Sequence, residues 1–310
     1  MKADPSLGLH GVYAILYAFF DTDGRLDRRA MRRQVEASIA AGAHGIAALG
    51  LATEVIKLSA NERTRIMDWV TTDVAGRVPL AFTISGETVD VQIAEAGRAW
   101  ASGADWLIHQ PPSKDAIADE AALVDFFAHV IVGDQRPSAI QNAPAYLGVG
   151  LGRDGLLELR RRSPRFRLLK GEGPAVEIAE VAAALGKGFP VFNGRGGLEL
   201  VDNLRAGCAG VIVAPDVVDF LAGVFEAMRM GRDAEAEELY RRALPAIVFV
   251  MQSIDTLITY GKRIAAWRIG LDVVHDRAPT LAPTAFGLAV ARRLSDALGV
   301  LGALQLNRES

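Results

Sequence analysis

Short apolar segments recur along the chain at roughly 20–30-residue spacing, and longer segments with helical periodicity separate them. The apolar segments are almost uninterrupted, which is typical of parallel β-strands that helices cover on the outside. The predicted strands are Gly11–Phe19, Gly45–Gly50, Pro79–Ser85, Trp106–Gln110, Ala139–Asn142, Arg167–Lys170, Pro190–Asn193 and Gly210–Ala214. Eight parallel strands are the number that closes a (β/α)8 barrel.

The segments between these strands place apolar residues three and four positions apart, which predicts amphipathic helices. The clearest of them are Arg29–Ala41, Asn61–Val74, Val89–Ser102 and Ala121–Val132. Ser59 followed by Glu62 has the spacing of a capping box. The alternation therefore predicts an α/β protein with a (β/α)8 TIM barrel. The alternative, an open doubly wound sheet, should show a glycine-rich phosphate fingerprint after its first strand, and Tyr17–Gly24 lacks one.

The pattern changes near Gly231, after which helical periodicity continues without a predicted strand. Three further helices are expected at Asp233–Gln252, Ile254–Ile269 and Pro283–Leu301. No flexible Gly/Ser-rich linker precedes them. We therefore expect residues 231–310 to form a C-terminal helical extension packed on a barrel of residues 1–230.

Composition excludes several classes of function. Half of the 310 residues are apolar and the net charge is −3, which gives no reason to expect a nucleic-acid or membrane partner. The single cysteine, Cys208, rules out an intrachain disulfide framework and favours the cytoplasm. The segment Met1–Leu9 lacks the charged and apolar regions of a signal peptide, so export is not expected.

Lys170 is the most informative residue, because it ends an apolar strand directly after Leu169 in a chain with only six lysines against 28 arginines. Active sites of (β/α)8 barrels lie at the C-terminal ends of the strands. Burial there disfavours the ammonium form. A neutral amine can then attack a carbonyl carbon and form an imine. The structural alternative is an ion pair with Glu172 or Glu54, and position alone leaves both interpretations open.

Other strand ends carry weaker signals. Glu54 follows the second strand and is interpreted first as a carboxylate at a helix N-terminus, or else as a group in the site. Arg195, in the glycine-rich turn Gly194–Gly197, is able to bind a carboxylate or to lie on the surface. His109 has no partner at metal-ligand spacing, so no metal site is expected.

Several motifs in order resemble the dihydrodipicolinate synthase / N-acetylneuraminate lyase family over most of the chain. The matching segments are Phe20-Asp21-Thr22-Asp23-Gly24-Arg25-Leu26-Asp27, Gly50…Glu54…Leu58-Ser59…Glu62-Arg63, Asn142-Ala143-Pro144, Leu169-Lys170 and Ala206-Gly207…Gly210-Val211-Ile212. The resemblance implies a (β/α)8 barrel, class I aldolase chemistry through a Schiff base on Lys170, and a homo-oligomer, either a dimer or a tetramer.

Three positions depart from the family pattern. The family's hydroxyl-bearing turn, which binds the pyruvate carboxylate, corresponds here to Leu51, Ala52 and Thr53. The family's proton-shuttling tyrosine corresponds to Gln141, which cannot act as a general acid or base. The arginine that binds the second substrate in the synthases corresponds to Tyr146. The resemblance with these departures implies a divergent lyase other than a strict dihydrodipicolinate synthase.

These observations define a candidate site and two functional hypotheses. Lys170 and Gln141 are the expected catalytic positions. The expected substrate-binding residues are Leu51, Ala52, Thr53, Glu54, Tyr146, Glu172, Asn193, Gly194, Arg195 and Ile212. The first hypothesis is a cofactor-free lyase or aldolase that acts on pyruvate or another 2-keto acid, by C–C cleavage or formation or by dehydration. In it, Glu172, Glu54, Tyr146 or bound water would replace the tyrosine. The second is a non-catalytic protein that binds a keto acid or sugar acid in the same pocket.

Overall fold

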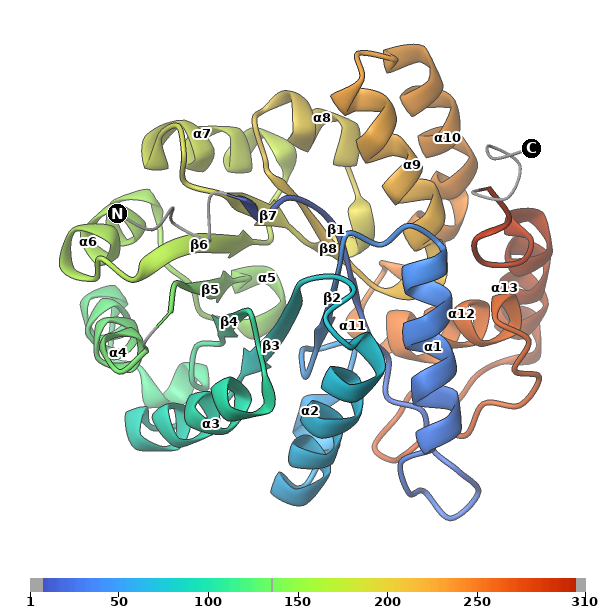
Figure 1. The fold of residues 1–310 in the computed structure, drawn as a ribbon, viewed down its shortest axis with the longest axis horizontal. Helices are drawn as coiled ribbons and strands as arrows, with labels where there is room; N and C mark the ends of the chain where they lie inside the picture. The colour runs from blue at the N-terminus through green and yellow to red at the C-terminus, as the bar shows by residue number, and fades with distance from the viewer. Residues whose placement is uncertain (1–7, 135, 305–310) are drawn as a thin grey trace.

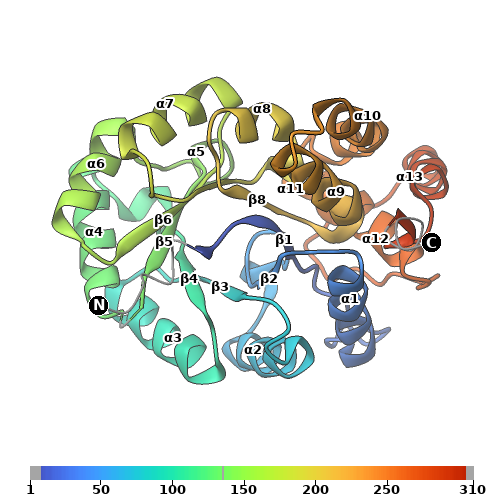
Figure 2. The same ribbon diagram turned by 45° about the horizontal axis from the view of Figure 1, so that its top comes forward.

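The computed structural model describes residues 8–134 and 136–304, and the expected barrel is confirmed. Each strand pairs in parallel with the next, and β8 closes the ring on β1, where Gly210 lies opposite Gly11. Figures 1 and 2 show the helices surrounding this barrel on the outside. The strands are β1 Gly11–Ile15, β2 Gly45–Ala48, β3 Leu80–Ile84, β4 Trp106–His109, β5 Ser138–Asn142, β6 Phe166–Gly171, β7 Val191–Asn193 and β8 Gly210–Val213.

The helices of the barrel occupy the positions that periodicity predicts, within one residue at each end for the four named above. Ser59 and Glu62 form both hydrogen bonds of the expected capping box. The α-helices are α1 Arg28–Ala40, α2 Ala60–Val74, α3 Val89–Ser102, α4 Glu120–Val132, α5 Pro144–Leu147, α6 Arg153–Arg162, α7 Ala175–Leu185, α8 Leu200–Arg205 and α9 Val218–Arg229. Short 3-10 turns are η2 Val55–Lys57, η3 Lys114–Ala116, η4 Arg195–Gly197 and η5 Pro215–Val217.

Aromatic side chains pack together in the interior of the barrel. Tyr13, Trp106 and Phe192 come from three different strands, and their ring centroids lie 5.4–5.5 Å apart. Gly45 permits this packing, because a Cβ there would lie 2.1 Å from the Tyr13 ring. Because these rings fill the interior, we expect the active site at the C-terminal ends of the strands.

The C-terminal helices pack against the barrel beside α9, as the right-hand part of Figure 1 shows. They are α10 Asp233–Val250, α11 Ile254–Thr256, the π-turn η6 Leu257–Gly261, α12 Lys262–Arg268 and α13 Ala285–Leu298. Their buried residues share one hydrophobic cluster with those of β1 and β8. Arg268 of α12 forms a fully buried ion pair with Asp219 of α9, with Nη2 2.7 Å from Oδ2.

The expected helix at Ile254–Ile269 is present as Ile254–Arg268, but it is not α-helical throughout. The π-turn η6 separates α11 from α12 and shifts the helical register by one residue. Gly261, at the end of this turn, lies against Tyr17, because a Cβ at Gly261 would be 2.4 Å from the Tyr17 hydroxyl. The absence of a side chain at Gly261 therefore lets the C-terminal extension lie close to the end of β1.

Among the described residues, no single helix is long and apolar enough to cross a bilayer. One bent pair, Asp233–Val250 with Ile254–Arg268, meets the length and composition criteria only across a 111° bend. The expectations for residues 1–7 and 305–310, which include both outer limits of the predicted domains, lie outside the described residues.

Asp216 is a buried carboxyl between the barrel and the extension. The Tyr17 hydroxyl donates a hydrogen bond to Asp216 Oδ1 at 3.0 Å, and Arg268 donates to the Asp216 backbone oxygen at 2.7 Å. Burial raises the pKa of Asp216 to about 7, with nearby Asp219 adding to the rise and the Tyr17 hydrogen bond opposing it. The folded state therefore favours the protonated form of this carboxyl.

Asp216 makes the free energy of unfolding depend on pH. Because its folded pKa is about 7 and the ordinary value is 3.8, its stabilising contribution is complete below pH 4 and is lost as pH rises through 7. The size of this contribution is on the order of 2–4 kcal/mol. Asp216→Asn should flatten the fall in the urea midpoint between pH 5 and pH 8. Equal slopes in the wild type and the variant would contradict this assignment.

Candidate active site

Lys170 points into the barrel near the C-terminal end of β6. Side chains alternate along the strand, so Leu169 packs outward in a second hydrophobic cluster and Lys170 faces the interior. Lys170 is 4% exposed, and its Nζ lies 2.9 Å from Glu172 Oε1. The structural alternative raised by the sequence, a pair with Glu172, is thus present, and it places a carboxylate directly beside the amine.

Glu172 receives a second hydrogen bond at the same oxygen. Gln141, opposite Lys170 on β5, donates from Nε2 to Glu172 Oε1 at 2.6 Å. Gln110, which follows β4, donates from Nε2 to Gln141 Oε1 at 2.9 Å. The sequence pattern assigns Gln110 no role, because the approach of two amides from neighbouring strands leaves no periodic signal along the chain.

Gly194, in the loop after β7, makes room for Glu172. A Cβ at Gly194 would lie 2.7 Å from the Glu172 carboxyl carbon and 2.8 Å from Oε2. Both distances are far below van der Waals contact, so a side chain at this position would displace the carboxylate. Gly194, one of the expected site residues, therefore contributes by lacking a side chain, which leaves room for the Glu172 carboxylate.

Gly194→Ala should lower turnover by on the order of 10²-fold, because a shift of about 1 Å in a reacting group has that effect. Gly97→Ala is the matched control, since a Cβ at this helical glycine of α3 meets nothing within 4 Å. Steady-state kinetics should show a fall in kcat with an unchanged melting temperature for Gly194→Ala. Equal kcat values in the two variants would show that Glu172 tolerates the methyl group.

A cavity of about 30 Å³ adjoins Lys170, which is room for roughly two water molecules. It brings together six of the expected site residues, namely Leu51, Ala52, Lys170, Glu172, Arg195 and Ile212. The rest of its wall is not among the residues expected from sequence and includes Met251, Ile254 and Leu257 from the C-terminal extension. A keto acid larger than this space requires the side chains at the mouth to move aside.

The turn after β2 presents backbone groups to this cavity. In the described structure, the N–H groups of Leu51 and Ala52 have no protein acceptor. Thr53 does not offer its hydroxyl as expected, because Oγ1 donates to Leu16 O at 2.6 Å and accepts from Leu49 N at 3.0 Å. Thr53 thus fixes the shape of the turn instead of lining the cavity.

Glu54 also stabilises this turn, through contacts with two lysines. Its backbone is left-handed, with φ of 56°, and its carboxylate pairs with Lys57 at 2.6 Å and with Lys262 of α12. Glu54 is the N-cap residue of η2, as the preferred sequence interpretation places it, but its side chain caps no backbone N–H and is paired with two lysines instead. The pKa of Lys262 is lowered by burial, and Glu54 opposes that change.

Tyr146 and Arg195 lie on the mouth side of Glu172. Burial raises the pKa of Tyr146, the charge of Glu172 adds to the rise, and a hydrogen bond with Arg195 opposes it. Arg195 also pairs with Glu199 at 2.8 Å. Asn193 is fully buried and turned away, because its amide Nδ2 donates to Gly173 O and its Oδ1 accepts from Gly194 N.

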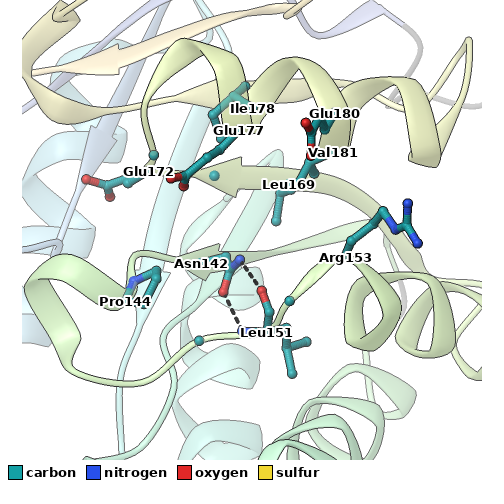
Figure 3. A pocket seen from close by; sticks show the side chains of 14 residues that line it. Asn142, Pro144, Leu151, Arg153, Leu169, Glu172, Glu177, Ile178, Glu180 and Val181 are labelled. Atoms are coloured by element: carbon teal, nitrogen blue, oxygen red, sulfur yellow. Dashed lines mark hydrogen bonds between the residues drawn. The ribbon is translucent and has the colours of Figure 1, made fainter.

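A larger cavity of about 380 Å³ lies outside the barrel, between the ends of β5 and β6 and helix α7. Figure 3 shows Asn142 and Leu151 facing each other in this cavity, joined by two hydrogen bonds of 2.8 and 2.7 Å, with Glu172 at one end and Arg153 at the other. Leu169 lines it, so it is on the opposite side of β6 from Lys170. No cluster of three or more metal-ligating side chains occurs within residues 8–134 and 136–304.

The comparisons with known proteins agree with this fold. The model of the dihydrodipicolinate synthetase family matches residues 8–285, so the chain belongs to this family. Dihydrodipicolinate synthase from Rhodopseudomonas palustris has the same fold, with a TM-score of 0.86, 20% identity, and coverage of 96% of this chain and 99% of that chain.

Curated relatives narrow the class of enzyme. The chain is 28% identical to L-2-keto-3-deoxyarabonate dehydratase of Azospirillum brasilense, covering 92% of this chain and 94% of that protein. It is 25% identical to a protein of Escherichia coli K12 named probable 2-dehydro-3-deoxy-D-pentonate aldolase, covering 81% and 85%. The protein is therefore a lyase, and the predicted family resemblance is confirmed.

Proposed function

We propose that this lyase dehydrates a 2-keto-3-deoxy sugar acid through a Schiff base on Lys170. The observation that supports it most strongly is the 2.9 Å contact between the buried Lys170 Nζ and the Glu172 carboxylate at the mouth of the barrel. The contact joins a nucleophile to a group able to take and return protons. Gln141 occupies the position of the family's tyrosine, so Glu172 is the proton carrier that remains beside the amine.

The reaction begins when Lys170 Nζ attacks the C2 carbonyl carbon of the substrate. The carbinolamine takes up a proton from solvent and loses its oxygen as water, and a protonated imine forms between Nζ and C2. The imine withdraws electrons from C3, so Glu172 removes a C3 proton and an enamine results. The enamine electrons expel the C4 hydroxyl, which leaves as water with the proton that Glu172 returns. Hydrolysis of the imine then releases the dehydrated keto acid and regenerates the amine.

The free N–H groups of Leu51 and Ala52 are the proposed site for the C1 carboxylate. Backbone N–H groups bind anions without help from hydroxyl side chains. This assignment explains how the site accommodates a 2-keto acid although the family's hydroxyl residues are replaced. Arg195 and Tyr146, on the mouth side, are the proposed contacts for the distal hydroxyl groups.

The similarity to L-2-keto-3-deoxyarabonate dehydratase supports dehydration of a keto-deoxy pentonate over condensation of pyruvate with a second substrate. The synthases' arginine for the second substrate is replaced by Tyr146, which favours a single-substrate reaction. We also propose that the enzyme acts as a homo-oligomer, a dimer or a tetramer, in the cytoplasm. Its chemistry requires no cofactor, because the imine serves as the electron sink.

The proposal is tested by incubating the protein with L-2-keto-3-deoxyarabonate or pyruvate, adding borohydride, and mapping the adduct by peptide mass spectrometry. An adduct on Lys170 with both compounds, and loss of water from the first alone, is the expected result. Thermal stabilisation by either compound without adduct or turnover would favour the non-catalytic binding protein. An adduct on Lys262 in place of Lys170 would show that the wrong lysine has been assigned.

A further inference from the structure

A relay of two buried amides ends on the Glu172 carboxylate. Glu172 Oε1 accepts from Lys170 Nζ at 2.9 Å and from Gln141 Nε2 at 2.6 Å. Gln141 Oε1 in turn accepts from Gln110 Nε2 at 2.9 Å. Gln141 is 1% and Gln110 5% exposed, so water does not compete freely for these hydrogen bonds. The direction of every donor in the relay is therefore set by the protein.

The Lys170–Glu172 pair dictates that direction. An ammonium is only a donor and an ionised carboxylate only an acceptor, so Glu172 Oε1 has no hydrogen to give. Gln141 must face it with its amide nitrogen, and the carbonyl end of Gln141 then faces Gln110. Gln110 must in turn present its own nitrogen. The ionised state of Glu172 thus orients both amides.

A protonated Glu172 allows the opposite orientation, because it has a hydrogen to donate. After it takes a proton from C3, its hydroxyl is able to donate to Gln141 only if Gln141 turns its carbonyl oxygen inward. Gln141 Nε2 then faces Gln110, which must turn as well. The relay has two self-consistent arrangements, one for each protonation state of Glu172. We propose that Gln110 is a positioning residue that, through Gln141, holds Glu172 as a base and reverses when Glu172 becomes an acid.

The backbone of Gln110 is held from outside the relay. Gln92 Nε2 donates to the Gln110 backbone oxygen at 2.8 Å, and Gln92 Oε1 lies 3.2 Å from His109 Nδ1. His109 Nε2 pairs with Asp134 at 2.9 Å. The titratable and charged groups around the relay are Lys170 and Glu172 with Tyr146 and Arg195 at one end, and His109 with Asp134 behind the other.

This inference rests on the proposed function, and its test uses pyruvate as the probe. The imine lets the enzyme exchange the C3 protons of pyruvate for deuterium, and NMR gives the exchange rate as a function of pH. Gln110→Leu should lower the rate about tenfold with an unchanged KM, because Gln141 is no longer oriented. Gln110→Glu should accept from Gln141 Nε2 and favour protonated Glu172, moving the acid limb upward by about one pH unit.

The control is Gln34→Leu, which removes another buried glutamine whose amide, among the described residues, bonds to the backbone of Tyr17. It should leave the exchange profile unchanged. Borohydride trapping of pyruvate on Lys170 should be equal in all variants, which shows that each retains a formed site. Equal trapping with wild-type exchange profiles in both Gln110 variants overturns the relay alone. Wild-type protein that traps no pyruvate overturns the proposed function and the relay together.

Discussion

Replacing Lys170 by methionine is expected to abolish the borohydride-trapped adduct and to lower turnover by on the order of 10³-fold or more. Methionine retains the length and apolar stem of the lysine, so the barrel interior stays filled. What disappears is the amine that makes the imine and, with it, the electron sink at C2. Mass spectrometry of the reduced protein and steady-state turnover measure the two effects separately.

Lys262 provides the matched control for this variant. It is also a fully buried lysine, but its Nζ pairs with Glu54 and lies 5.3 Å from the centre of the Phe20 ring. Lys262→Met should cost stability while the adduct on Lys170 persists. Residual adduct in Lys170→Met, or its disappearance in Lys262→Met with the protein still folded, would contradict the assignment of the nucleophile.

Glu172→Gln is expected to lower kcat by about 10²–10⁴-fold, the usual contribution of a general acid or base. The amide fills the same space beside Gly194 but cannot take the C3 proton. Imine formation does not need that proton transfer at C3, so trapping with pyruvate should persist while deuterium exchange at C3 falls. The measurement is therefore the ratio of exchange rate to trapped fraction, which separates the two steps.

Glu177→Gln is the control for Glu172, because Glu177 is an exposed carboxylate of α7 outside the barrel. It should leave both exchange and trapping at the wild-type level. If Glu172→Gln retained the wild-type exchange rate, then Tyr146 or bound water would have to carry the proton, and the role given to Glu172 would be wrong.

The barrel could be predicted from sequence because its signals are local. A buried parallel strand needs a short apolar run, and each covering helix needs apolar residues at helical spacing, whatever the rest of the chain does. Lys170 stood out for the same reason, as a charged residue at the end of such a run. The position of a reactive group on a strand is thus accessible from a single sequence.

The partners of that group are not accessible in this way. Thr53, Glu54 and Asn193 have the residue types of a site, yet the structure commits their side chains to backbone or ion-pair contacts. Gln110 has no distinctive sequence signal and becomes visible only because β4 and β5 lie side by side. Contacts between elements distant in the chain decide these roles, and periodicity does not encode them.

Met251, Ile254 and Leu257, which line the cavity beside Lys170, belong to a stretch of chain that follows all eight strands. The reactive groups and these three apolar wall residues thus come from separate segments of the chain, while the barrel supplies further apolar wall residues such as Ile15, Leu51 and Ile212. Substitutions confined to these three positions should change which keto acids the cavity accepts. They should leave the capacity of Lys170 to form the imine intact. Selectivity in this molecule is open to change without rebuilding its reactive centre.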